Sequence, residues 1–135
     1  IYPSTIYVKI QKTNFYAKIN IDGETFLIGS NGKLSPNHFQ NNDLPFIFGK
    51  PNIKEFLYFK NIIDQSKFSY DQIENLYFYP SKRWDLKLKN NILLKLPNDL
   101  NQKTLNYIYD FAKNYKGEKF TEIDARIKRQ IILNE

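Results

Sequence analysis

The sequence predicts an α+β domain in which two helices cover one face of a mainly antiparallel sheet. Three observations carry this prediction. Short segments alternate apolar and polar residues, turn dipeptides such as Asn-Gly and Asp-Gly separate several of them, and two segments repeat apolar residues at helical spacing instead. Strands joined by tight turns pair antiparallel, and the helices that interrupt them must then pack on the sheet as a second layer.

The alternation is clearest in residues 82–96. Trp84 and Leu86 fall on one side of an expected strand, while charged residues occupy the positions between them. Asn90-Asn91 is expected to form a two-residue type I′ turn, because asparagine tolerates positive φ. Beyond this turn the apolar residues alternate again, which predicts a β-hairpin with one apolar and one charged face.

The other elements follow from the same signals. Further strands are expected at residues 5–12, 15–21, 25–28, 44–49, 73–79, 120–126 and 129–133. A first helix is expected over residues 52–65, and residues 35–43, which lack periodicity, are expected to form a loop. Asn98 or Asn101 is expected to cap a second helix that Gly117 ends. Its expected apolar stripe consists of Leu105, Ile108, Tyr109, Ala112 and Tyr115.

The composition excludes several classes of protein. The chain of 135 residues contains no cysteine, so a thiolate nucleophile, a cysteine-ligated metal and a disulfide framework are all excluded. The net charge of +6 comes almost entirely from lysines that are spread along the chain, which is typical of a solvated surface. No apolar run approaches the roughly 18 residues that span a bilayer. Because the sequence starts at Ile1 and contains no methionine, we expect an internal fragment, and any membrane anchor is expected upstream of it.

The residues that could carry catalysis are scarce. His38 is the single histidine and lies in an asparagine-rich segment without an acidic neighbour. Glu122 and Asp124 alternate with Ile123, which predicts a solvent-facing row rather than a catalytic acid pair. We therefore expect no enzyme, no catalytic residue, no metal site and no cofactor.

Aromatic residues interleaved with basic ones leave a second interpretation open. Single-stranded nucleic acids bind sheet faces on which aromatic rings stack against bases beside cationic side chains. The candidates for such a surface are Tyr77, Phe78, Tyr79, Arg83 and Trp84. A nucleic-acid-binding sheet domain is therefore the alternative to a protein-binding domain.

Five short motifs, taken in order, resemble the extracytoplasmic region of the FtsQ/DivIB family of bacterial cell-division proteins. The motifs are residues 2–10 (YPSTIYVKI), 27–32 (LIGSNG), 44–49 (LPFIFG), 83–90 (RWDLKLKN) and 123–126 (IDAR). The first is similar to the proline-led strand that closes the family's POTRA domain, and the others are similar to segments of its β domain. The resemblance implies that residues 1–11 end a POTRA domain and that residues 12–135 form the β domain.

The resemblance also implies a function. Members of the family are non-enzymatic scaffolds of the divisome with one transmembrane helix in the inner membrane. Their periplasmic domains hold FtsB and FtsL, which relay to septum synthesis. This fragment is accordingly expected on the periplasmic side, without nucleic acid as a partner.

The C-terminal strand is the expected site of partner binding. The last strand of an open sheet presents unpaired backbone N–H and C=O groups that can pair with an incoming strand. The expected partner-binding residues are Arg126, Ile127, Arg129, Ile131, Ile132 and Leu133. Selectivity is expected from Ile131 and Leu133 on one face and from the two arginines, which would pair with acidic partner residues. The same edge offers an alternative, edge-to-edge pairing of two copies of the chain, and the arginines alternatively guard the edge against aggregation.

Overall fold

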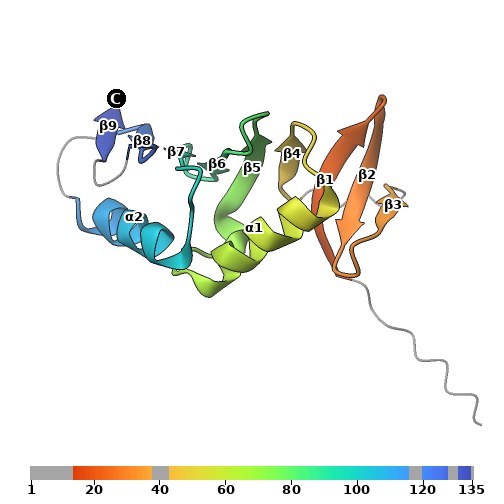
Figure 1. The fold of residues 1–135 in the computed structure, drawn as a ribbon, viewed down its shortest axis with the longest axis horizontal. Helices are drawn as coiled ribbons and strands as arrows, with labels where there is room; N and C mark the ends of the chain where they lie inside the picture. Colours follow the sequence, from red (N-terminus) through yellow and green to blue (C-terminus); the bar gives the residue numbers. More distant parts are fainter. Residues whose placement is uncertain (1–13, 38–42, 116–119, 128–130, 135) are drawn as a thin grey trace, which may run out of the picture.

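Two helices pack against one extended, twisted sheet in the computed structural model, which describes residues 14–37, 43–115, 120–127 and 131–134 (Figure 1). The described strands are β1 (Phe15–Ile21), β2 (Glu24–Gly29), β3 (Leu34–Pro36), β4 (Phe46–Phe48), β5 (Ile73–Phe78), β6 (Trp84–Leu88), β7 (Leu93–Lys95), β8 (Glu122–Asp124) and β9 (Ile132–Asn134). The helices are α1 (Ile53–Gln65) and α2 (Gln102–Asn114), with a short 3₁₀ turn, η1 (Tyr70–Gln72), after α1. The expected α+β class is confirmed.

The strands lie in the order β3-β2-β1-β4-β5-β6-β7-β8-β9. Five of the eight neighbouring pairs are antiparallel, which agrees with the predicted mainly antiparallel sheet. The other three are parallel, because β4 inserts between β1 and β5, and β8 lies parallel to β7. The helices α1 and α2 are the crossovers that lead from β4 to β5 and from β7 to β8, as parallel pairing requires.

Besides the turn at Asn31-Gly32, which joins β2 to β3, two tight turns were predicted, and the structure confirms one of them as a two-residue turn. Asp22 and Gly23 both have positive φ, at 51° and 87°, as a type I′ turn demands. At the second turn only Asn91 has positive φ, at 71°. The N–H of Asn91 donates to the carbonyl of Leu88, and the N–H of Leu88 donates to the carbonyl of Ile92. The loop therefore has three residues, 89–91, and the expected two-residue turn is wrong.

Other differences from the expected elements are local. The segment 35–43 was expected to be a loop, but it contributes to β3, a short edge strand that ends at Pro36. The helix α1 is capped by Asn52, whose side chain accepts from the N–H of Glu55, and α2 is capped by Asn101. Tyr115 follows α2 as an exposed residue, so it does not belong to the apolar stripe. The strand expected at residues 5–12 and the stop at Gly117 lie outside the described residues.

The two helices bury the same face of the sheet. Side chains of α1 and α2 share one apolar core with the inward-facing residues of the central strands, among them Leu76, Leu86 and Leu94. Trp84 is buried beside Phe56 and Phe59 of α1. The opposite face of β4 to β7 carries no helix in the described part of the chain (Figure 1). The predicted arrangement of two helices on one face is therefore confirmed.

Candidate functional site at the C-terminal sheet edge

The strand β9 forms one end of the sheet. It pairs antiparallel with β8, and no other described strand lies on its outer side. The shorter strand β8, residues 122–124 rather than the expected 120–126, pairs in turn with β7. The candidate site is therefore a two-strand ribbon at the end of the sheet, flanked by α2.

The backbone of β9 directs hydrogen-bonding groups outward. The carbonyl of Asn134 accepts from the N–H of Thr121 at 2.9 Å, so Asn134 faces β8. Because the two hydrogen-bonding sides of a strand alternate from residue to residue, the N–H and C=O of Leu133 point away from β8. The same alternation directs the N–H of Ile131 outward. An incoming strand would meet these groups.

The side chains of the last strand divide between the two faces. Ile131 and Leu133 are half-buried and pack against the core on the helix side. Ile132 lies on the opposite face and is 37% exposed, and Ile127 before it is 55% exposed. Arg129, which the sequence also placed in the site, lies outside the described residues.

Arg126 is already paired within the chain. Its Nε and Nη2 donate to the two carboxylate oxygens of Asp124 at 2.9 and 2.6 Å, and its backbone N–H also donates to Asp124. The guanidinium hydrogen bonds hold the pKa of Asp124 below its usual value and raise the pKa of Arg126. Asp124 is buried, so the solvent-facing row predicted for Glu122 and Asp124 is wrong at this position.

More ion pairs continue along the same face of the sheet. Lys95 Nζ lies 3.1 Å from Glu122 Oε1, and Asn134 donates from its side chain to the same carboxylate. The hydrogen bond from Asn134 is the main reason that the pKa of Glu122 is lowered. Arg83 pairs with the buried Asp85. The acids beside the edge are therefore neutralised by the chain's own cations.

A groove of about 400 Å³ adjoins the edge on the helix side. It lies between α2 and the segments before β9, and its apolar wall includes Tyr107, Ala125, Ile127 and Ile131. Sequence reasoning missed this groove because it joins segments that are distant along the chain. The only signal for the groove was that two large apolar residues, Tyr107 and Ile127, occupy exposed positions.

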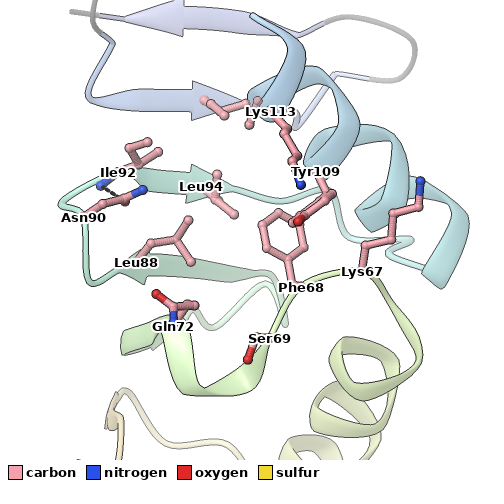
Figure 2. A pocket seen from close by; sticks show the side chains of 12 residues that line it. Lys67, Phe68, Ser69, Gln72, Leu88, Asn90, Ile92, Leu94, Tyr109 and Lys113 are labelled. Atoms are coloured by element: carbon pink, nitrogen blue, oxygen red, sulfur yellow. Dashed lines mark hydrogen bonds between the residues drawn. The ribbon is translucent and has the colours of Figure 1, made fainter.

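A second hollow lies farther from the edge (Figure 2). It measures about 300 Å³ and opens between α2 and residues 67–72, above β6 and β7. Figure 2 shows Phe68 and Tyr109 meeting at its centre, with Lys67 and Lys113 at its margin. Lys67 is held by Asp110 at 2.7 Å. Among the described residues, no histidine or carboxylate lines this hollow to activate the hydroxyl of Ser69.

The residues proposed for nucleic-acid binding do not form one surface. Phe78 and Trp84 contact each other on the helix side of the sheet, with ring centroids 4.7 Å apart. Tyr77 and Tyr79 lie on the opposite side of the sheet, and Arg83 forms an ion pair with Asp85. The described residues also contain no group of three or more His, Asp or Glu side chains able to hold a metal ion.

The fold and this edge define a class: an α+β domain whose described sheet ends at β9, beside an apolar groove. The family model of the cell division protein FtsQ/DivIB, C-terminal, matches residues 10–126. The chain belongs to the FtsQ/DivIB family. No curated protein matches the chain in sequence.

The fold is similar to a solved member of that family. The major extracytoplasmic domain of the trans isomer of the bacterial cell division protein DivIB from Geobacillus stearothermophilus has a TM-score of 0.50 and 10% sequence identity. The similarity covers 78% of this chain and 90% of that domain. Family membership gives the chain a role in cell division, and proteins of this family are membrane-anchored, scaffold-type components with an extracytoplasmic domain. None of the described helices is long and apolar enough to cross a membrane.

Proposed function

We propose that this chain is the periplasmic β domain of a non-enzymatic divisome scaffold that binds FtsB/FtsL-like proteins by strand addition at β9. The observation that carries the proposal is the outward direction of the Leu133 backbone at a sheet end with no further described strand. Strand addition gains affinity from main-chain hydrogen bonds and selectivity from side chains on either face of the new strand. The bound partner in turn connects this scaffold to the synthesis of the septum at the inner membrane.

The side chains around β9 support this mode of binding. A partner strand would lay alternate residues beside Ile132 on one face and over the groove next to Ile131 on the other. Arg126 acts within the domain, because its guanidinium holds Asp124 and so fixes the end of β8. We therefore assign Arg126 a positioning role, and we keep Ile127, Arg129, Ile131, Ile132 and Leu133 as the residues that meet the partner. Residues 1–11 are proposed to close the preceding POTRA domain.

The test removes one outward backbone donor. Proline at position 131 deletes an N–H that an added strand needs, and it stands before Ile132, the first residue of β9 that pairs with β8. The Ile131→Pro variant should bind the extracytoplasmic segment of the FtsB-like protein from the same genome at least tenfold more weakly, as measured by isothermal titration calorimetry. Ile131→Ala is the matched control, because it shortens the same side chain and keeps the N–H.

The outcomes separate the alternatives. Equal affinities of the proline and alanine variants, both folded by circular dichroism, would exclude strand addition at this edge. Loss of a dimer in the proline variant, measured by light scattering without any partner present, would show instead that the edge pairs two copies of the chain. Fluorescence anisotropy with single-stranded DNA tests the nucleic-acid alternative, for which salt-dependent binding is the signature.

A further inference from the structure

Aromatic rings gather on the helix-free face of the sheet, well away from β9. This outer aromatic patch consists of Phe46, Phe48, Tyr77 and Tyr79. The Phe48 ring lies 4.9 Å from Phe46 and stacks on Tyr77 at 5.1 Å. Phe48 is 45% exposed and Tyr79 is 37% exposed. The solvated face of an antiparallel sheet usually carries polar residues, so a cluster of large rings here requires an explanation.

Two lysines flank the patch. The register places Lys18 opposite Phe46, Phe46 opposite Asn75, and Asn75 opposite Lys87. Three strand spacings therefore separate the two lysines, about 14 Å in all. Neither side chain forms an ion pair with any described residue, in contrast to the cations nearer β9. Lys87 also lines a shallow hollow of about 300 Å³ together with Tyr77 and Tyr79.

Three acids of this face are already paired within the chain, and Glu74, exposed in the bulge of β5 opposite Lys87, forms no ion pair with that lysine. Asp85 is held by Arg83 and by the hydroxyl of Tyr79 at 3.0 Å. Glu122 and Asp124 are held by Lys95 and Arg126. The patch is therefore apolar at its centre, and at each margin lies a lysine that forms no ion pair with any described residue. An occupant that complements it must present apolar side chains between two separated carboxylates.

We propose that the outer aromatic patch docks an acidic amphipathic helix of a partner protein, at a surface separate from the β9 edge. Every strand beneath the patch is hydrogen-bonded on both sides, so no free backbone edge is available and recognition must come from side chains. A helix meets this need, because it projects apolar residues at i, i+3, i+4 and i+7 from one face. At about 1.5 Å per residue, some ten residues span the distance between the two lysines.

The distribution of charge favours such a helix over a nucleic acid. A phosphate backbone gains affinity from many cations, and the described part of this face offers two that lack an acidic partner. A helix with two carboxylates requires only the two lysines and the rings between them.

The test uses a designed probe. A synthetic helical peptide of about 14 residues carries leucines on one face and a glutamate toward each end of that face, and a second peptide has lysines in place of the glutamates. Binding to the full chain is measured by fluorescence anisotropy, and the site is located by ¹⁵N chemical-shift mapping. The acidic peptide should bind at least tenfold more tightly than the basic one and shift the amides of β4, β5 and β6.

Charge reversal makes the experiment decisive. The double variant Lys18→Glu/Lys87→Glu should bind the acidic peptide at least tenfold more weakly and the basic peptide more tightly than the parent chain does. Phe48→Ser should lower the affinity for both peptides. Tyr58→Ser, on the exposed side of α1, is the matched control and should change neither affinity. Equal binding of the two peptides, shifts confined to α1 or α2, or saturation of the same amides by oligothymidylate would each overturn the proposal.

Discussion

The indole of Trp84 stacks on the ring of Phe59, with centroids 4.4 Å apart and an interplanar angle of 8°. This contact joins β6 to α1, and Phe78 of the neighbouring strand packs on the same indole. Trp84 is thus the point at which the hairpin, the strand β5 and the first helix share one apolar contact. The contact holds the helix layer to the centre of the sheet.

Replacement of Trp84 by alanine should cost about 3–5 kcal/mol of unfolding free energy, because a large buried ring is lost and a cavity remains. Equilibrium denaturation in urea measures the change. Tyr58→Ala is the control, since Tyr58 lies on the same helix with 69% of its surface exposed. That variant should stay within about 0.5 kcal/mol of the parent. Equal losses in the two variants would contradict the buried contact.

The three-residue loop makes a prediction that the two-residue turn does not. Asn91→Gly should stabilise the domain by up to about 1 kcal/mol, because glycine adopts positive φ without steric cost. Asn90→Gly should destabilise it by about 1 kcal/mol, because the Asn90 side chain accepts from the N–H of Ile92 at 3.2 Å. Thermal denaturation of the two variants compares them. If the turn were of type I′, both Asn90→Gly and Asn91→Gly would stabilise the domain, and that result would contradict the three-residue loop.

Much of the sheet could be predicted because its information is local. The alternation around Trp84 and Leu86 identifies the buried face of β6 without knowledge of any partner strand, and the same holds for the stripe of α2 through Leu105 and Ile108. The spacing of apolar residues is set by the geometry of the element itself. The buried faces of the strands and the positions of the helices could therefore be predicted from the sequence.

The pairing of distant segments was not accessible. The insertion of β4 between β1 and β5 depends on long-range contacts, which the sequence of a three-residue strand does not predict. The strand β3 also has too few residues to show an alternating pattern. At the site, the outward backbone of Leu133 follows from its alternation with Asn134, and the pairing of Arg126 with Asp124 depends on local folding. The groove beside Ile131 requires α2 and the end of the chain to meet. Tertiary arrangement decides these features.

Gly49 and Gly23 should respond differently to alanine. Both have positive φ, but a Cβ on Gly49 would lie 2.2 Å from the carbonyl oxygen of Phe78, whereas a Cβ on Gly23 would meet nothing within 4 Å. Gly23→Ala should cost about 1 kcal/mol from backbone strain alone. Gly49→Ala should cost about 3 kcal/mol or more, because β4 must shift away from β5. Urea denaturation compares the two, and equal costs would show that the close approach is absent.

The Asp124–Arg126 pair should make the C-terminal ribbon sensitive to acid. The guanidinium lowers the pKa of Asp124 in the folded chain below the usual 3.8, so the carboxylate's contribution to stability is present above that pH and is lost as the pH falls through the lower folded value. Hydrogen exchange of the β8 and β9 amides, followed from neutral pH downward and corrected for intrinsic exchange rates, should show protection falling in that range. Asp124→Asn should reduce protection at neutral pH and flatten this fall, and Arg126→Ala should do the same because it removes the partner. An unchanged acid response in both variants would show that the pair does not hold the ribbon.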